Sequence, residues 1–417
     1  MACIAGARPQ PSRELGALDG CPGVLRLHAA ADGYLARVRL PGGQVDARGL
    51  EALAEAASLG SDIVELTSRA GLQVRGLAED SGRELAQLLA GGGLLPSFTH
   101  ERVRNIVAPP LAGRDPASVA PVDGVVEELD RELCADATLA QLPGRFLFAV
   151  DDGTRVLDGM RADVQLTAER DGAQPAFRLW LDGLATSLTV ATEQAPGAAL
   201  QAARGFLALR KENAEGAWRV RELEGGAEQL AGYLGLDLFE RSAAGSSVPS
   251  PAPARALAPA TARERGLGVH IQRDGLFAVA VLPPLARLGR AQLERLAQLA
   301  HGLDSGAGLD ARVRVSPWRT LTFVDVEASV VEQLLGELEA MGLIASDDSG
   351  WSGLSACAGM GACGRALADV RAAATERALV RKPGSPSEHW SGCERRCGEP
   401  ADAGVRVVAT EHGMVTL

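Results

Sequence analysis

The chain of 417 residues has no apolar run close to the ~18 residues that a membrane-spanning helix needs. Its N-terminus, MACIAGARPQPSREL, lacks the apolar core of a secretory signal peptide. Seven cysteines in a chain without such a signal are typical of a reducing compartment. We therefore expect a cytoplasmic protein without a membrane partner.

An excess of positive charge is also absent. The formal net charge is −11, which disfavours a nucleic-acid partner because no basic surface would dominate the field. Lysine is nearly missing, since only Lys211 and Lys382 occur and almost every basic side chain is an arginine. A GC-rich genome accounts for such a bias in general, but it does not account for the places where the arginines cluster.

Four cysteines near the C-terminus form the most informative pattern. The segments CAGMGAC and SGCERRC place them as C-x5-C, a gap of roughly thirty residues, and C-x3-C; they are Cys357, Cys363, Cys393 and Cys397. Four thiolates can hold a [4Fe–4S] cluster, one on each iron. Structural zinc sites favour two to four intervening residues, so a zinc site is the less fitting alternative and ordinary thiols are another. The remaining cysteines, Cys3, Cys21 and Cys134, are predicted to be ordinary thiols.

A repeated pattern indicates an internal duplication. Alternation over 34–40 predicts a strand, an apolar face over 50–57 predicts a helix, and 63–66 and 72–77 predict two more strands. The same order returns as strand 276–282, helix 293–300, and strands 311–315 and 321–326. The chain is also long enough for about two to four domains. We therefore predict two copies of a small α+β unit.

The rest of the chain divides around these copies. The first copy, with an N-terminal extension, is expected over 1–100 and the second over 266–344. Residues 101–240 form a mixed middle domain with a strand at 146–150 and a helix at 198–209, and 345–417 form the cysteine domain. Residues 241–265 are rich in Pro, Ala and Ser and predict a linker.

Polar side chains of the first copy are predicted to gather on one face of its sheet. Alternation and the turn between the last two strands bring together five of them, namely Arg37, Arg39, Arg69, Gln73 and Arg75. Guanidinium groups pair bidentately with carboxylates, so this face suits a ligand that carries several carboxylates. A solvated sheet face is the alternative. The second copy has apolar residues on its first strand, although Arg312, Arg314 and Arg319 are candidates to contribute from across a pseudo-two-fold axis.

Several segments together carry a family resemblance. They are RVRLPGG (37–43), ELTSRAGLQVRGL (65–77), RNIVAPPLAG (104–113), LPGRFLFAVDDG (142–153) and the four cysteines, in that order. With them the chain resembles the nitrite/sulfite reductase superfamily. Within it, CPGVLRLHAAADG (21–33), the TSRAGLQVRGL turn and the short length are similar to the precorrin-3B synthase family. The resemblance implies an α+β fold: two ferredoxin-like half-domain repeats packed together plus two α/β nitrite/sulfite reductase-type domains.

The resemblance also implies an activity, which is oxygen- and NADH-dependent hydroxylation of precorrin-3A with γ-lactone formation in aerobic cobalamin biosynthesis. It implies a [4Fe–4S] cluster on the four cysteines and a mononuclear non-haem iron that activates oxygen. His28 and His389 are the candidate ligands of that iron, whereas His100, His270, His301 and His412 have no motif context. No G-x-G-x-x-G segment follows a predicted strand, so NADH is expected to act through a separate electron-donor reductase.

The family's site residues transfer to matching positions only. Arg37, Arg39, Arg69 and Arg104 match side chains that grip tetrapyrrole carboxylates, and Asn105 accompanies Arg104. Arg145 and Leu147 stand where the reductases have two lysines that protonate the bound oxyanion. Arginine keeps its charge and leucine has no proton to give, which disfavours sulfite or nitrite reduction. No catalytic proton donor is identified.

Two other functions stay open from the sequence. One is a sirohaem-dependent sulfite or nitrite reductase, in which sirohaem is a bound cofactor. The other is a non-catalytic tetrapyrrole-binding protein or an iron–sulfur electron carrier.

Overall fold

The computed structural model describes residues 20–172, 174–213, 216–239, 266–303, 313–400 and 403–417. Within these residues the chain forms eight α-helices and four β-sheets, so the predicted α+β class is confirmed. The expected linker at 241–265, together with Cys3 and Arg312, lies outside the described residues. None of the helices in the described part of the chain is long and apolar enough to cross a membrane.

The two predicted copies have the same order of elements. The first consists of β1 (His28–Ala30), β2 (Gly33–Val38), β3 (Gln44–Val45), α1 (Ala47–Ser58), β4 (Ile63–Leu66), β5 (Leu72–Leu77) and α2 (Gly82–Gly91). The second consists of β12 (Gly268–Ile271), β13 (Phe277–Val281), β14 (Arg287–Gly289), α7 (Arg290–Gly302), β15 (Val313–Val315), β16 (Leu321–Val326) and α8 (Ala328–Ala340). The duplication predicted from the sequence is therefore present in the structure.

The copies exchange one short strand each. One sheet has the order β1-β2-β5-β4-β14 and the other β12-β13-β16-β15-β3, so β14 pairs with the first copy and β3 with the second. The pairings are antiparallel, as in Leu288 opposite Val64 and Val313 opposite Val45. This reciprocal exchange joins the copies across a pseudo-two-fold axis.

The turn that carries Arg69 is repeated in detail. Thr67 accepts hydrogen bonds at Oγ1 from the amides of Arg69 and Gly71, at 3.4 and 3.3 Å. Ser316 accepts equivalent bonds at Oγ from the amides of residues 318 and 320, both at 3.1 Å. The fourth residue of each turn, Ala70 or Arg319, has a positive φ of 53° or 68°. The two turns are therefore built alike, and only the side chains that they present differ.

A single apolar core lies beneath both sheets. Helix α1 starts at the N-cap Asp46, whose side chain accepts from the amide of Gly49 at 2.7 Å. Its buried face includes Leu50 and Leu53, and the buried face of α7 includes Leu293 and Leu296. These helices pack against each other, and their buried side chains belong to the same cluster as those of the strands in both copies. Burial of this shared apolar surface holds the two copies together.

The middle part of the chain forms a six-stranded sheet of order β11-β10-β9-β8-β7-β6 with helices α3, α4 and α5. Its strands are β6 (Ile106–Val107), β7 (Phe148–Asp151), β8 (Val164–Asp171), β9 (Gln174–Leu181), β10 (Leu184–Ala191) and β11 (Leu238–Phe239). Its helices are α3 (Asp123–Ala135), α4 (Ala195–Asn213) and α5 (Gly226–Leu234). The predicted strand at 146–150 begins two residues later, and the predicted helix at 198–209 is part of the longer α4.

The cysteine segment forms a four-stranded sheet, β17-β18-β19-β20, with helix α9. The elements are β17 (Leu354–Ala356), α9 (Val370–Val380), β18 (Glu388–Ser391), β19 (Val405–Thr410) and β20 (Gly413–Thr416). Strands β17, β18 and β19 are parallel, and β20 is antiparallel to β19. The sequence limits expected for the five domains remain predictions.

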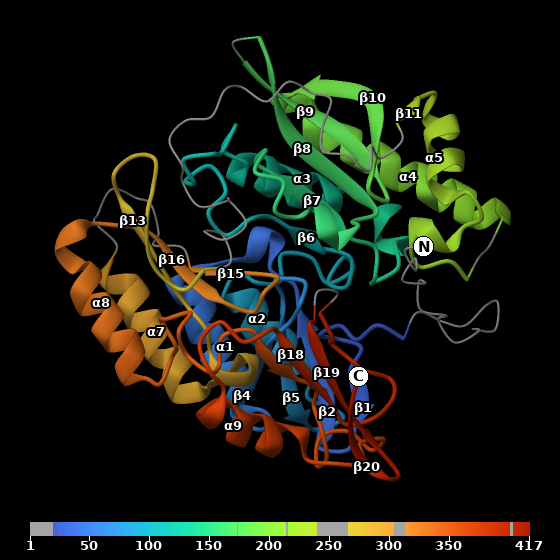
Figure 1. Ribbon diagram of the computed structural model, residues 1–417. Coiled ribbons are helices and arrows are strands. Elements are labelled where there is room, and N and C mark those ends of the chain that lie inside the picture. Colours follow the sequence, from blue (N-terminus) through green and yellow to red (C-terminus); the bar gives the residue numbers. More distant parts are fainter. Residues whose placement is uncertain (1–19, 173, 214–215, 240–265, 304–312, 401–402) are drawn as a thin grey trace, which may run out of the picture.

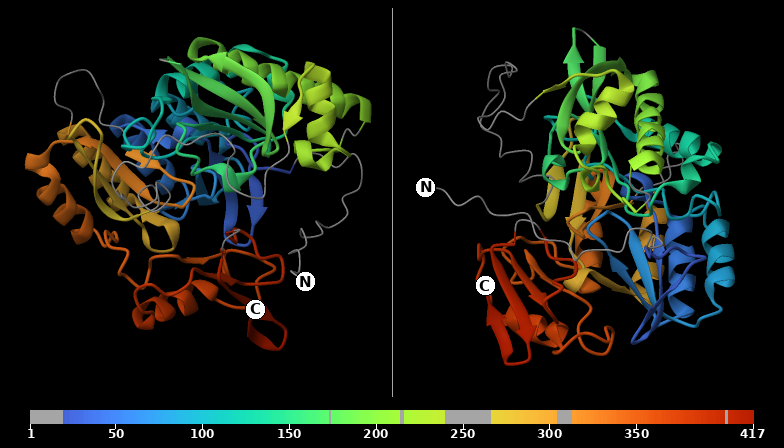
Figure 2. Two further views of the ribbon diagram at one scale, coloured as in Figure 1. Left: turned by 45° about the horizontal axis from the view of Figure 1, so that its top comes forward. Right: turned by 90° about the vertical axis from the view of Figure 1, so that its right-hand side faces the viewer.

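The paired copies contact both of the other units. In Figure 1 and in both views of Figure 2 the six-stranded sheet (green) lies at the top, above the copies (blue, and yellow to orange), and the right view of Figure 2 shows the cysteine unit (red) beside the first copy. A charged contact joins the second copy to the middle unit: Arg314, with no exposed side-chain surface, donates to both oxygens of Asp123 at 3.0 and 2.7 Å. Arg314 is therefore a structural cation at this interface.

Candidate functional site

Arg37, Arg39 and Arg69, here called the arginine group, lie together beside the middle unit. Arg37 is on β2, Arg39 follows that strand, and Arg69 is in the turn between β4 and β5. In addition to burial, repulsion from the neighbouring guanidinium groups of this set contributes to lowering the pKa values of Arg39 and Arg69, so the three charges lie close together. The structure therefore brings together three of the predicted arginines.

Two backbone carbonyls of the loop before β7 hold this group. The carbonyl of Gly144 accepts from Nη2 of Arg39 at 3.3 Å and from Nδ2 of Asn105 at 3.0 Å. The next carbonyl, that of Arg145, accepts from Nη1 of Arg69 at 3.1 Å. Four sequence motifs that are far apart in the chain therefore meet at two adjacent peptide groups.

The arginine group carries positive charge that, among the described carboxylates, Glu101 offsets only through space, by partly counteracting the lowering of the pKa of Arg39 by burial. In the described part of the chain none of its three members forms an ion pair with Asp or Glu, and their side chains contact carbonyls and the thiol of Cys21. Burial and then the guanidinium groups of Arg219, Arg39 and Arg37 lower the pKa of Arg69 to about 9. Burial is likewise the main cause that lowers the pKa of Arg39. An anionic ligand would relieve this repulsion, so the site suits an anion.

Cys21 is a neighbour that the sequence interpretation missed. Its buried thiol donates to the carbonyl of Gly144 at 3.4 Å and accepts from Arg37 and Arg39 at 3.5 and 3.4 Å. Gly23, two residues after Cys21, lies so close to Glu101 that a Cβ at this position would be 2.0 Å from the carboxylate. The CPG segment is thereby fixed beside the arginines, and its presence among the quoted motifs was the available signal.

A row of paired residues leads from the arginine group across the sheet. Arg37 lies opposite Gln73, Gln73 opposite Glu65, and Glu65 opposite Arg287. Directly opposite residues of antiparallel strands share one face, so this row lies on a single face of the sheet. Gln73 is occupied there by a hydrogen bond from Nε2 to Glu65 at 2.6 Å.

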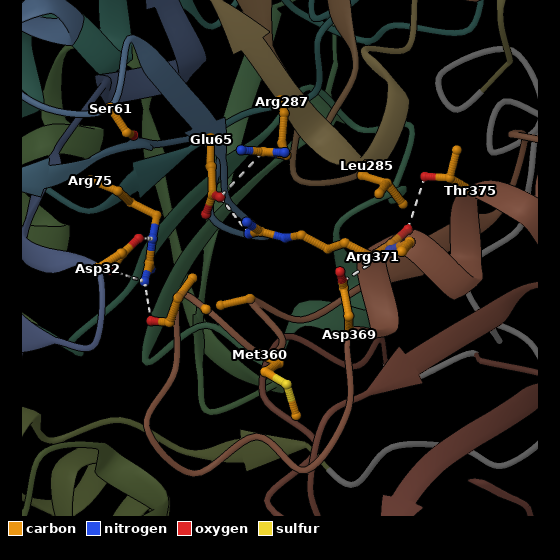
Figure 3. A pocket seen from close by; sticks show the side chains of 14 residues that line it. Asp32, Ser61, Glu65, Arg75, Leu285, Arg287, Met360, Asp369, Arg371 and Thr375 are labelled. Carbon is orange, nitrogen blue, oxygen red and sulfur yellow. Dashed lines mark hydrogen bonds and ion pairs between the residues drawn. The ribbon is translucent and has the colours of Figure 1, made fainter.

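The far end of this row opens into a cavity of about 410 Å³ (Figure 3). Its walls are the first sheet, the segment 358–362 between the first two cluster cysteines, and the start of α9. The buried carboxylate of Glu65 forms an ion pair with Arg371, and its Oε1 lies 3.7 Å from Nε of Arg287. Arg75 pairs bidentately with Asp32, both bonds at 2.9 Å, and donates to the carbonyl of Ala362 at 2.7 Å. These contacts fix the cysteine segment against the polar face.

The four cysteines are gathered at the carboxyl ends of β17 and β18. Cys357 follows β17 and Cys393 follows β18, and the amide of Gly392 donates to Sγ of Cys357 at 3.1 Å. Burial and then the other three cysteines raise the pKa of the Cys397 thiol, so all four lie close to one another. None of the six cysteines in the described residues forms a disulfide.

This arrangement fits an iron–sulfur cluster. Four gathered thiols can hold a [4Fe–4S] cluster, in which each iron takes one thiolate. An amide that already donates to a cysteine sulfur is a further feature of a site for a negatively charged cluster.

The other predicted binding residues lie elsewhere or are engaged. Arg104 pairs bidentately with Asp130 at 2.8 and 2.6 Å and donates to the carbonyl of Leu94 at 2.9 Å, so its guanidinium ties the first copy to α3. Arg145 lies over the ring of Trp218, 5.2 Å from its centroid. Arg75 lies at the cavity and not in the arginine group. Their roles as ligands of a substrate remain predictions.

Leu147 and His389 are buried, whereas His28 is exposed. Leu147 is 2% exposed and belongs to an apolar cluster with Ala70, Val107 and Ala149. His389 is buried, with Nδ1 2.8 Å from Oγ of Ser355 and Nε2 3.2 Å from the carbonyl of Cys397. Both of its ring nitrogens therefore have partners, whereas His28 is exposed at the edge of the first sheet.

Comparison with known proteins shows which family the chain resembles. The family described as nitrite/sulfite reductase ferredoxin-like half domain matches residues 28–91 and again residues 270–341. In both copies the chain is similar to the nitrite/sulfite reductase superfamily. The two matched segments correspond to the two copies described above, so the predicted pair of ferredoxin-like half-domains is confirmed.

Relatives in this superfamily span most of the chain. The ferredoxin–nitrite reductase of Synechococcus elongatus is 27% identical and covers 89% of this chain and 76% of its own. The precorrin-3B synthase of a Sinorhizobium species is 26% identical, with 94% and 81% covered. The sulfite reductase [ferredoxin] 2 of Mycolicibacterium paratuberculosis is 24% identical, with 91% and 71% covered.

A solved structure shares the fold. The NirA protein of Mycobacterium tuberculosis superposes with a TM-score of 0.70 over 92% of this chain and 73% of its own, at 21% sequence identity. The overall arrangement predicted from the resemblance, two half-domains with two further reductase-type units, is therefore confirmed.

Proposed function

We propose that the protein is an oxidoreductase that acts on a bound precorrin, as a precorrin-3B synthase. In this proposal it hydroxylates precorrin-3A with oxygen, and a γ-lactone forms in the product. NADH supplies electrons through a separate reductase, and the reaction takes place in the cytoplasm. The observation that carries the proposal is the arginine group, which forms no ion pair with a carboxylate in the described residues. Its member Arg37 shares a sheet face with Glu65, which pairs with Arg371 of the cysteine unit.

The charge of the arginine group supports a ligand with several carboxylates. A precorrin carries many carboxylates around its ring, and planar guanidinium groups bind them bidentately. Arg37 is on β2, Arg39 follows that strand and Arg69 is in the turn between β4 and β5, so one sheet positions all three positive side chains in a protein whose net charge is −11. A small anion with one charge would engage only part of this group.

The four cysteines support electron delivery to the bound ligand. A [4Fe–4S] cluster held by Cys357, Cys363, Cys393 and Cys397 would supply single electrons when it is bound. The role of the chain is to position the ligand: Arg75 and Arg371 hold the cysteine segment against the face from which the arginines extend. These contacts would keep the cluster close to the half-domain that binds the substrate.

Leu147 separates the synthase from the reductases. Leu147 occupies one of the two positions at which the reductases have lysine. In this chain it is buried among apolar side chains. An apolar side chain has no proton to transfer to an oxyanion. Arg145 at the other position stays charged, so the pair favours ligand binding over proton donation. The precorrin-3B synthase relative, which covers 94% of this chain, agrees with this proposal.

The proposal is tested with anaerobically reconstituted protein, precorrin-3A, NADH, ferredoxin, ferredoxin reductase and oxygen. A product heavier by one oxygen atom supports it. Unchanged substrate mass with an intact cluster would sink it, and precorrin binding without oxygen consumption would favour a non-catalytic carrier.

A second candidate is a sirohaem-dependent nitrite or sulfite reductase. The nitrite reductase relative favours this candidate, because it is 27% identical to this chain and the synthase relative is 26% identical. Sirohaem absorption in the purified protein and reduction of nitrite or sulfite by reduced ferredoxin would establish it. Protein without sirohaem that leaves both anions unreduced would exclude it.

A further inference from the structure

Ser391 is a buried hydroxyl without a partner beside the cysteines. It is the last residue of β18, its side chain has no exposed surface, and among the described residues its Oγ has no hydrogen-bond partner. A buried hydroxyl that makes no hydrogen bond destabilises the folded protein, because it has lost its hydrogen bonds to water. Such a group in a core therefore requires an explanation, and a ligand that accepts its proton provides one.

The strand register places this hydroxyl next to Cys357. Strands β17 and β18 are parallel, with Ser355 beside His389 and Ala356 beside Trp390. The amide of Cys357 donates to the carbonyl of Trp390 at 2.9 Å, so the ladder continues and the next neighbours are Cys357 and Ser391. Neighbours in register on adjacent strands have side chains on the same face. Ser391 and Cys357 therefore share the face on which the cysteines gather.

A backbone hydrogen-bond donor already reaches the sulfur of Cys357. The amide of Gly392, the residue after Ser391, donates to Sγ of Cys357 at 3.1 Å. The chain thus turns at 391–392 so that one donor reaches the cysteine and the adjacent hydroxyl remains unused. In the sequence SGC the serine lies two residues before Cys393, a second cysteine of the predicted cluster site.

We propose that Ser391 is a positioning residue for the cluster, whose hydroxyl donates a hydrogen bond to a cluster sulfide near Cys357 and thereby raises the reduction potential. This rests on the cluster in the proposed function. Reduction adds one negative charge to the cluster, and a hydrogen bond to sulfur stabilises the more negative state more strongly. The hydroxyl makes the cluster easier to reduce by the electron donor.

The experiment is a redox titration of the reconstituted full-length protein, followed by electron paramagnetic resonance of the reduced cluster. Ser391→Ala is expected to lower the reduction equilibrium constant about tenfold, which corresponds to about 59 mV for one electron. Ser391→Thr keeps the hydroxyl and is expected to keep the wild-type potential. An unchanged potential in Ser391→Ala would overturn the proposal.

The matched control is Ser355→Ala. Ser355 lies on the same face two residues before Cys357, but its hydroxyl is engaged by the carbonyl of Glu388 at 3.3 Å and by Nδ1 of His389 at 2.8 Å. Its removal is expected to leave the potential unchanged. An equal shift in this variant would show general loosening of the sheet and contradict the role of Ser391. Wild-type protein that forms no cluster would instead overturn the proposed function itself.

Discussion

Arg39 donates a hydrogen bond from Nη2 to the carbonyl of Gly144 at 3.3 Å, and this bond joins the first half-domain to the middle unit. The two residues are 105 positions apart in the sequence. The same carbonyl also accepts from Asn105 and Cys21. The polar face of the half-domain is thereby fixed relative to the loop that carries Arg145, and the arginine group exists only because these units fold together.

Replacement of Arg69 by alanine is expected to weaken precorrin binding. A hydrogen bond to a charged group contributes about 1.5–3 kcal/mol, which corresponds to a loss of about 10–100-fold in affinity. Anaerobic titration calorimetry with precorrin-3A measures this, while cluster absorbance should not change. Arg83→Ala, an exposed arginine on α2 of the same half-domain, is the control and should bind like the wild type. Loss of the cluster in Arg69→Ala would contradict the assignment of Arg69 to precorrin binding.

Removal of one cluster cysteine is expected to abolish the cluster. Cys363→Ala leaves three thiolates for four irons, so the broad visible absorbance of a reconstituted [4Fe–4S] protein should be lost. Cys134→Ala is the matched control, because Cys134 is on α3 in the middle unit. Its absorbance per protein should equal that of the wild type. A cluster retained in Cys363→Ala would refute the ligand set.

Loss of Asp123 is expected to destabilise the fold strongly. Its carboxylate takes both hydrogen bonds from buried Arg314 and also pairs with Arg114 at 3.1 Å. Removal of one partner of a buried pair costs about 3–5 kcal/mol. Glu128→Ala, on the same helix α3 but paired with Arg131 at the surface, should cost less than ~1 kcal/mol. Denaturant unfolding of both variants measures the difference, and equal losses would show that the interface pair is not structural.

The stability of the protein is expected to fall as the pH rises from about 4 to about 7. Burial and then the Asp152 carboxylate raise the pKa of Asp151 to about 7. Over that range the folded state keeps a proton that the unfolded state has released, so rising pH favours unfolding, by about 2–4 kcal/mol in total. The melting temperature of Asp151→Asn should depend less on pH than that of the wild type. Asp171→Asn, at the exposed end of β8, should retain the wild-type dependence.

Local pattern was sufficient for the regular elements of the repeat. The strands 63–66 and 72–77 were predicted with their observed bounds, because alternation over four to six residues fixes a half-buried strand. The exchanged strands β3 and β14 were not predicted, since two or three residues carry no period. Their pairing depends on the other copy, which a local pattern does not describe.

The candidate site was only partly predictable for the same reason. The spacing of the cysteines identified a cluster site, and alternation placed Arg37 and Gln73 on one face. The partners of Arg104 and Arg75 are Asp130 and Asp32, and no local rule pairs residues 26 or 43 positions apart. The burial of Cys21 between two arginines likewise arises from tertiary packing.

The most direct test of the central claim uses isotopically labelled oxygen. Reconstituted protein with precorrin-3A, NADH, ferredoxin and ferredoxin reductase is exposed to ¹⁸O₂, and the product is examined by mass spectrometry. Our account predicts that the product contains one ¹⁸O atom and that nitrite and sulfite are not reduced under the same electron supply. A product without label, together with reduction of either anion, would contradict it.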